Sequence, residues 1–334
     1  MELSLPPLKI KKHAALYRRF PELQQASLRD KQQGQWILFG QDLSSLRIAL
    51  IEEWAQQRLQ LVAAWQVGDY DVLLIKNDLS DPIKAAVYRA ECDFALTKDL
   101  PELNKPGLVV MDMDSTAIEM ECIDEIAKLA GTGELVSAIT EQAMQGELDF
   151  EQSLRQRVAT LSGADEAILA QVLEQLPLMP ELIELVRTLQ AFGWKVAIAS
   201  GGFTYFANQL KAMLDLDGVY ANQLAIQDGK LTGEVVGSVV DANAKAYYLH
   251  QLSEQFEIEP HNTVAIGDGA NDLAMMKAAG LGIAFHAKPK VQQQAQTAIN
   301  YGSLGAVLCI LSASLVPHHL SWKNQPVISG SLAK

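Results

Sequence analysis

One stretch restricts the fold more than any other: an apolar run that ends in two carboxylates and two hydroxyls, Val109-Val110-Met111-Asp112-Met113-Asp114-Ser115-Thr116. Leu108 to Met111 has the continuous apolar character of a strand buried on both faces of a parallel sheet, and we expect helix from Ala117 onward. In open α/β sheets, ligands bind in the crevice at the carboxyl ends of the strands. The pattern therefore predicts an α/β fold with Asp112 and Asp114 in that crevice.

Two further strand-like runs lead into polar turns. Val264 to Ile266 precedes a glycine-rich turn that carries Asp268, Asn271 and Asp272, and Val196 to Ala199 precedes Ser200-Gly201-Gly202 and an expected helix. Backbone N–H groups at such a helix start suit a phosphate. Lys245 lies on a helical stretch from Ala242 to Phe256. Together these groups form a constellation suited to phosphoryl transfer.

The chemistry follows from charge, because a phosphate monoester is doubly anionic and repels an attacking carboxylate. Asp112, Asp268 and Asp272 offer the hard oxygen ligands that Mg²⁺ prefers. The metal and Lys245 would neutralise the charge that develops during the reaction. One carboxylate could then attack phosphorus in line, while Asp114 protonates the leaving alkoxide and later deprotonates the attacking water.

The order and separation of these motifs resemble the haloacid dehalogenase (HAD) superfamily, and within it most closely the phosphoserine phosphatases. The resemblance extends from Asp112 to Asp272 and departs at Met113, where the superfamily often has an aromatic residue. It implies a HAD-like Rossmannoid parallel sheet with an inserted helical cap. It also implies that Asp112 is the nucleophile and forms an aspartyl-phosphate. Asp114 stands where the resembling ATPases have Thr, which favours fast hydrolysis of that intermediate.

The same resemblance assigns roles to the remaining residues. It implies Mg²⁺ ligation by the side chains of Asp112 and Asp268 and the carbonyl of Asp114, with Asp272 acting partly without direct contact. It places Lys245 at the substrate, and it implies that Ser200 and Gly201 cradle the phosphate and that Asn271 hydrogen-bonds the substrate beside the metal. Each residue also has an ordinary structural explanation as a turn glycine or a helix cap. The combination with two acidic motifs favours the functional one.

Between the first motif and Ser200 the sequence predicts a helical cap at about residues 119–180. Helical patterns cover 119–131, 134–145, 150–161 and 165–176, and Pro180 fits the first turn of the helix that returns to the core. Glu121 and Arg157 would match the ammonium and carboxylate of a phosphorylated amino acid. Their spacings from Asp112 match the substrate-binding Glu and Arg of phosphoserine phosphatases, and Met144 and Phe150 match apolar substrate-contacting positions. The structural alternatives are a solvated helix face for Glu121 and a salt bridge with Glu151 or Asp165 for Arg157.

Residues 1–103 are predicted to form a separate α+β domain with βαββαβ order, which is ferredoxin-like and similar to ACT-like regulatory modules. Its expected elements are 36–39, 44–57, 59–66, 70–76, 81–91 and 93–97. A linker at 104–107 leads to the catalytic core, 107–310, and a C-terminal tail, 311–334. Three roles stay open for this domain: homodimerisation is ranked first, sensing of serine second, and simple stabilisation remains.

Composition restricts the partners. A net charge of −13 and a pI near 4.9 argue against nucleic-acid or acidic-membrane partners, because no surplus of cations exists to hold phosphate backbones. The apolar run at 306–316 is too short to span a bilayer, and the start of the chain lacks a signal-peptide pattern. Three widely separated cysteines indicate a reducing compartment without disulfides, so we expect the cytoplasm. His318-His319 has no metal spacing and is expected at the surface.

The sequence thus predicts a Mg²⁺-dependent phosphatase whose small-molecule substrate, by resemblance, is O-phosphoserine, at the last step of serine biosynthesis. One alternative is a related phosphatase or phosphotransferase for another phosphorylated amine or alcohol, which would not need Glu121 and Arg157 together. Another is a catalytically silent protein that senses an amino acid. The complete acidic set disfavours that last alternative.

Overall fold

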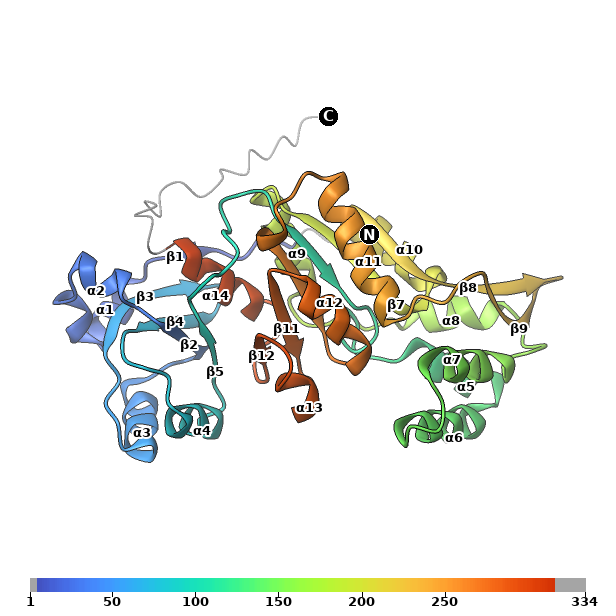
Figure 1. Ribbon diagram of the computed structural model, residues 1–334, viewed down its shortest axis with the longest axis horizontal. Coiled ribbons are helices and arrows are strands. Elements are labelled where there is room, and N and C mark those ends of the chain that lie inside the picture. The colour runs from blue at the N-terminus through green and yellow to red at the C-terminus, as the bar shows by residue number, and fades with distance from the viewer. Residues whose placement is uncertain (1–4, 316–334) are drawn as a thin grey trace.

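The computed structural model describes residues 5–315, which form two units, each built on one β-sheet. In Figure 1 the N-terminal unit lies at one end of the long axis, the parallel sheet in the middle and a group of helices, α5 to α8, at the other end. No helix within the described residues is long and apolar enough to cross a membrane. The three cysteines are free and buried.

The larger sheet has the strand order β12-β11-β10-β6-β7-β8-β9, in which only the β8–β9 pair is antiparallel. Strand β6 (Leu108–Met111) lies between β10 (Thr263–Gly267) and β7 (Lys195–Phe203). Every residue of β6 is buried, as expected for an apolar strand covered on both faces. The predicted HAD-like α/β fold is confirmed. The remaining strands are β8 (Gly218–Gln227), β9 (Lys230–Val236), β11 (Leu281–Phe285) and β12 (Thr297–Ile299).

Helices cover both faces of this sheet. Alternate residues of β6 belong to different cores: Val109 and Met111 pack with α9 (Leu182–Ala191), α10 (Thr204–Leu214) and α14 (Ala306–Ser312), whereas Leu108 and Val110 pack with α11 (Ala242–Gln255) and α12 (Leu273–Ala278). This alternation is the period of two of a β-strand. The predicted helix that carries Lys245 is present as α11, and Asp241 caps it by accepting from the N–H of Ala244.

The group of helices at the far end is the cap. Its helices are α5 (Cys122–Ala130), α6 (Gly133–Met144), α7 (Phe150–Ala159) and α8 (Ala167–Glu174), close to their predicted positions. The helix expected from Ala117 onward is wrong, because the N–H groups of residues 116–118 all donate to the carbonyl of Met113 and close a tight loop. Pro180 also lies outside the first turn of α9, which begins only after Glu181 in a left-handed conformation with φ of 62°.

The N-terminal unit contains the predicted βαββαβ series: β2 (Trp36–Gln41), α3 (Ser45–Ala55), β3 (Leu61–Val67), β4 (Tyr70–Ile75), α4 (Asp81–Arg89) and β5 (Asp93–Leu96). Its antiparallel sheet has the order β1-β3-β4-β2-β5, which is the ferredoxin-like order with the short β1 (Ile10–Lys11) added at one edge. Two further helices, α1 (Ala14–Arg19) and α2 (Leu28–Gln32), precede β2.

One helix of the catalytic part packs against the N-terminal sheet. All seven residues of α14 are buried, and the indole N–H of Trp65 on β3 donates to the hydroxyl of Ser312 over 2.7 Å. The predicted tail, 311–334, therefore begins with helical residues up to Leu315, of which residues 311–314 are buried. Residues 316–334, including the His318-His319 pair, lie outside the described residues. The domain boundaries themselves stay predictions.

Candidate active site

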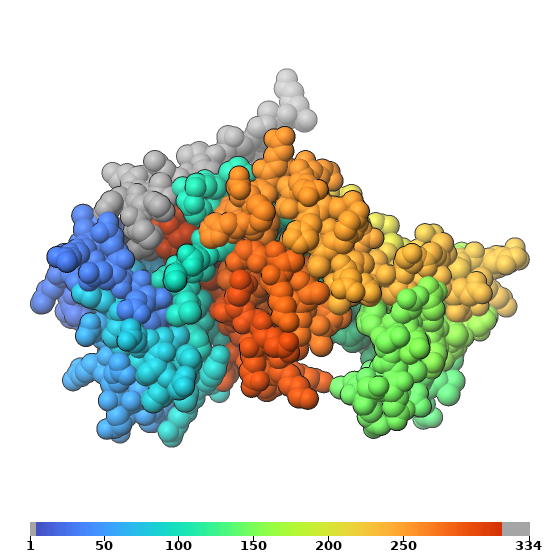
Figure 2. All heavy atoms as spheres, in the orientation of Figure 1, coloured from blue at the N-terminus to red at the C-terminus, as the bar shows by residue number. Residues whose placement is uncertain are grey.

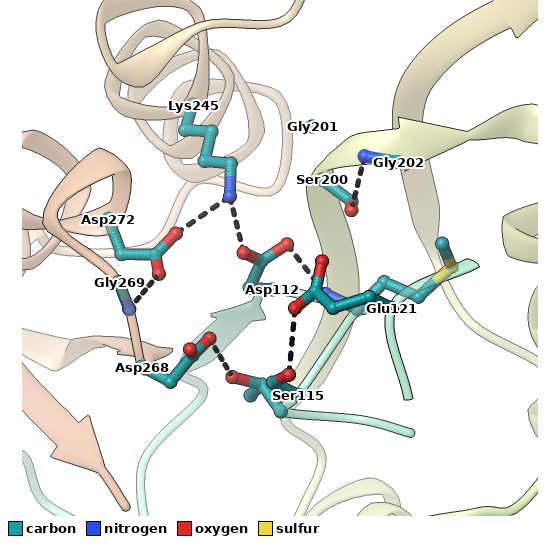
Figure 3. Close-up of polar contacts among 12 residues, drawn as sticks. Asp112, Ser115, Glu121, Ser200, Gly201, Gly202, Lys245, Asp268, Gly269 and Asp272 are labelled. Carbon is teal, nitrogen blue, oxygen red and sulfur yellow. Dashed lines mark hydrogen bonds and ion pairs between the residues drawn. The ribbon is translucent and has the colours of Figure 1, made fainter. Parts of the chain in front are cut away.

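The centre of the site is a lysine between two carboxylates. Asp112 directly follows β6, Asp272 lies at the start of α12, and Lys245 reaches both from α11. The Lys245 Nζ atom is 2.7 Å from a carboxylate oxygen of each aspartate, and its side chain is fully buried (Figure 3). Burial alone would lower the pKa of Lys245, but the two carboxylates raise it above its ordinary value. The lysine is therefore a fixed positive charge.

A third carboxylate completes an acidic cluster. Asp268 follows β10, and one carboxylate oxygen from each of Asp112, Asp268 and Asp272 lies within 4.8 Å of the other two. Burial, followed by the charge of Asp112, raises the pKa of Asp268 to about 6 and also raises that of Asp272. Crowded, buried oxygen ligands of this kind suit a divalent cation that prefers oxygen, so the residues fit a metal site. The side chain of Asp114 does not belong to this cluster.

A backbone cradle lies beside Asp112 on β7. The Ser200 hydroxyl accepts from the N–H of Gly202 over 2.9 Å. A Cβ at Gly201 would lie 2.5 Å from the ring of Phe150 on the cap, and one at Gly202 would lie 2.9 Å from the carboxylate of Asp114. Both positions thus require glycine, because other groups approach the backbone closely. Strand β7 continues through these residues to Phe203, whereas the sequence suggested that it ends before them.

Asp114 is a carboxyl group with one oxygen held away from water. The residue is half-buried, and its buried Oδ1 atom has no hydrogen-bond partner among residues 5–315. Burial raises the pKa of Asp114 well above its usual range, and the charges of Glu121 and Asp112 add to this, while the thiol of Cys122 acts in the opposite direction. A carboxyl group that keeps its proton near neutral pH can serve as a general acid.

The cap contributes one acid and one base to the same site. Glu121 accepts from the Ser115 hydroxyl over 2.8 Å, and burial raises its pKa. The Nε atom of Arg157 is buried without a partner in the described part of the chain, and burial lowers the pKa of this guanidinium.

The surface explanations for Arg157 do not hold. Glu151 pairs instead with Arg155 at 2.8 Å, and Asp165 accepts from the N–H of Ala167. A buried guanidinium Nε–H without an acceptor is costly, and an anionic partner would lower that cost.

Core and cap enclose one cavity of about 760 Å³. Figure 2 shows the corresponding hollow between the cap helices and the rest of the molecule. Of the predicted site residues it is lined by Asp112, Asp114, Glu121, Arg157, Ser200, Gly201, Asp268 and Asn271, together with Met144 and Phe150. Lys245 and Asp272 do not line it: Lys245 is linked to the site by its ion pair with Asp112, and Asp272 by its ion pair with Lys245.

Several residues of the site were not assigned a role from the sequence. Asn222 on β8 donates to the carbonyl of Gly201 over 2.8 Å and so supports the cradle. The Thr116 hydroxyl donates to Asp268 over 3.3 Å, and Asp124 and Lys288 line the cavity. Thr116 and Asp124 carried a local signal, because one belongs to the first motif and the other lies one helical turn from Glu121. Nothing local marks Asn222 or Lys288.

Comparison with known proteins adds to this geometry. Residues 106–280 match the family described as haloacid dehalogenase-like hydrolase, and residues 32–96 match a domain of unknown function, DUF5609. The chain is 55% identical over 324 residues to a phosphoserine phosphatase of Vibrio cholerae, which covers 97% of this chain and 99% of that protein.

Solved structures agree with this comparison. The crystal structure of a probable phosphoserine phosphatase from Vibrio cholerae aligns with a TM-score of 0.88 at 55% identity, covering 95% of this chain and 98% of that one. A substrate-bound phosphoserine phosphatase aligns with a TM-score of 0.58 at 42% identity, covering 61% of this chain and 97% of that one. The similarity thus extends over both units in the first case, and over little more than half of this chain in the second.

Proposed function

The chain belongs to the phosphoserine phosphatases of the haloacid dehalogenase-like hydrolases, and from this membership we propose that it hydrolyses O-phospho-L-serine to L-serine and phosphate with Mg²⁺. One observation carries the assignment of residues: a single cavity is lined by Asp112 and Ser200, which we assign to the phosphate, and by Glu121 and Arg157, which we assign to the amino-acid part of the substrate. By its chemistry this is the last step of serine biosynthesis.

Asp112 is the proposed nucleophile. Its carboxylate oxygen bonds to phosphorus as the bond from phosphorus to the serine oxygen breaks, which gives an aspartyl-phosphate. Lys245 holds the attacking carboxylate in place and offsets its charge, and the cradle at Ser200 and Gly201 orients the phosphate. A bound Mg²⁺, held by Asp112, Asp268 and the carbonyl of Asp114 with Asp272 beside them, would further neutralise the phosphate.

Asp114 is the proposed proton carrier. It donates its proton to the leaving serine alkoxide and then takes a proton from the water that attacks the aspartyl-phosphate, which releases phosphate and regenerates Asp112. The raised pKa of Asp114 suits the first of these steps, since the group must arrive protonated. Its partner-free Oδ1 atom leaves an oxygen available for the reacting group.

In the proposed complex, the Glu121 carboxylate pairs with the substrate ammonium and the Arg157 guanidinium with the substrate carboxylate. Asn271 lines the cavity near Asp268 and would hydrogen-bond the substrate there. The apolar side chains of Met144 and Phe150 cover the short carbon chain of the substrate.

The test is Mg²⁺-dependent phosphate release from three matched esters: phosphoserine, phosphoethanolamine, which lacks the carboxylate, and 3-phosphooxypropanoate, which lacks the ammonium. Asp112→Asn should be inactive on all three. Arg157→Gln should lower kcat/KM for phosphoserine about 10- to 100-fold and leave phosphoethanolamine unchanged, because one charged hydrogen-bonded contact is lost. Arg155→Gln is the matched control, since Arg155 lies on the same helix but pairs with Glu151 at the surface.

The outcome separates the alternatives. Equal rates on the three esters, unchanged in Arg157→Gln, would point to a phosphatase for another small phosphorylated amine or alcohol. No phosphate release from any ester would favour the alternative of a catalytically silent protein that senses an amino acid. Homodimerisation through the N-terminal unit and a cytoplasmic location stay predictions, the first of which light scattering at enzyme concentrations would decide.

A further inference from the structure

The N-terminal unit holds one loop of the catalytic part through a carboxylate that accepts several of the loop's backbone N–H groups. Asp93, at the start of β5, is 1% exposed, and its carboxylate accepts the backbone N–H groups of Asn300, Tyr301 and Gly302 over 2.8 to 3.0 Å. A buried carboxylate with three N–H donors is well satisfied and orders the segment that supplies them. The loop 300–303, which follows β12, is therefore held in place by the N-terminal unit.

The same loop is also hydrogen-bonded to a tyrosine of the N-terminal unit. The N–H of Ser303 donates to the Tyr70 hydroxyl over 2.8 Å, and the hydroxyls of Tyr70 and Ser303 lie 2.9 Å apart. The Ser303 hydroxyl itself donates to the carboxylate of Glu181, so its oxygen must accept the proton of Tyr70. Burial raises the pKa of Tyr70 to about 12, which keeps that proton in place at neutral pH. A directed chain runs from Tyr70 through Ser303 to Glu181.

Glu181 ends one of the two segments that join the cap to the core, residues 115–121 and residues 177–181, here termed the first and second cap crossings. Its φ of 62° is a left-handed conformation that is unfavourable for a non-glycine residue, so its contacts must hold it there. The two crossings are paired: Met179 N–H donates to Ala117 and Glu119 N–H donates to Pro177, each over 2.9 Å. The first crossing continues directly from Asp114.

The crossings are loosely supported on one side. A cavity of about 390 Å³ is lined by Ser115, Glu119, Met179 and Pro180 of the crossings, and by His286 and residues 301–303 of the core. Because no side chain fills this space, the contacts around it determine how the second crossing lies on this side. The Ser303–Glu181 bond and the Leu304 N–H, which donates to the Pro180 carbonyl over 3.4 Å, are among them.

We propose that Tyr70 of the N-terminal unit is a positioning residue for the phosphatase reaction, acting through Ser303 and Glu181 on the second cap crossing and so on the placement of Glu121 and Arg157 over Asp112. The proposal rests on the proposed function, because it concerns the part of the substrate that the cap binds. It gives the N-terminal unit a role in substrate recognition, although none of the described residues of that unit lines the cavity around Asp112.

Tyr70→Phe tests it, since the ring stays and only the hydroxyl is lost. We expect kcat/KM for phosphoserine to fall about three- to tenfold, the range of one hydrogen bond, while that for p-nitrophenyl phosphate, which needs no cap contacts, stays within twofold. Ser303→Ala should reproduce the loss and Ser303→Thr, which keeps a hydroxyl, should restore most of it. Amide hydrogen exchange should become faster at residues 177–181 in both impaired variants.

Tyr301→Phe is the matched control. The Tyr301 hydroxyl joins the same loop to the same unit by donating to the Tyr88 carbonyl over 2.9 Å, but within residues 5–315 no hydrogen bond leads from this hydroxyl to Glu181. This variant should keep wild-type kinetics even where its melting temperature falls as much as that of Tyr70→Phe. Unchanged phosphoserine kinetics in Tyr70→Phe, or an equal loss in Tyr301→Phe, would overturn the proposal. Should the wild type fail to cleave phosphoserine, the function is wrong, and hydrogen exchange at 177–181 still decides whether Tyr70 holds the crossing.

Discussion

Replacing Lys245 with methionine removes the buried cation that joins Asp112 to Asp272 while keeping most of the side-chain volume. Two carboxylates at 0–7% side-chain exposure then face each other without the ammonium that lay 2.7 Å from each. Breaking a buried ion pair by removing one partner costs about 3–5 kcal/mol. Without metal, we expect a melting temperature lower by on the order of 10 °C.

Added Mg²⁺ should stabilise Lys245→Met more than it stabilises the wild type. The variant lacks the positive charge that repels the metal, and its two carboxylates are left without a cation to neutralise them. Activity should move in the opposite direction. Loss of a charge that stabilises the transition state lowers kcat about 10²- to 10³-fold. The variant is therefore expected to bind metal more tightly and to turn over more slowly.

The assay is thermal unfolding in chelator and across a Mg²⁺ titration, with phosphoserine turnover measured in parallel. Lys195→Met is the control, since the Lys195–Asp217 pair has the same 2.7 Å distance but a lysine that is 41% exposed, and exposed pairs contribute about 0–1 kcal/mol. Equal melting of wild type and Lys245→Met in chelator, or a smaller Mg²⁺ effect in the variant, would refute this account of the charges.

Three further outcomes are expected. Gly201→Ala should lower kcat/KM for phosphoserine at least tenfold with little change in melting temperature, because the added Cβ meets the Phe150 ring at 2.5 Å and displaces the cap. Asn262→Ala should cost about 1–3 kcal/mol in chemical denaturation but leave activity intact, since Asn262 accepts from Glu102 N–H and donates to the carbonyls of Lys105 and Pro106. The preference for phosphoserine over 3-phosphooxypropanoate should fall as pH drops through the raised pKa of Glu121, and Glu121→Gln should abolish that dependence.

The sign of the pH effect follows from protonation. Below its raised pKa Glu121 is neutral and cannot pair with the ammonium, and above it the carboxylate is charged. Taking the ratio of two substrates cancels the titration of groups that act on both. A preference that is constant with pH, or equally pH-dependent in Glu121→Gln, would show that Glu121 does not recognise the ammonium.

For Asn262→Ala, faster proteolysis within residues 102–106 would show that the loss of stability lies in the linker.

The sequence by itself determined the structural features that depend on residues close together in the chain. Continuous apolar runs identified β6, β7 and β10, because a strand covered on both faces needs no polar side chain. The carboxylates after the runs of β6 and β10, and the Ser-Gly-Gly sequence after the run of β7, located the site. The βαββαβ order of the N-terminal unit was likewise predicted, since each of its turns and helix caps is local.

Only the tertiary structure decided where distant residues meet. The loop at 116–118 has helix-compatible residues but bonds to Met113, and Asn222 reaches Gly201 from a strand 21 positions away in the sequence. Tyr70 and Ser303 are separated by 233 positions, and Ser303 and Glu181 by 122. The burial of the Asp114 Oδ1 atom also depends on how cap and core close together. Burial and long-range hydrogen bonds arise from the packing of whole units, and no local pattern in the sequence records them.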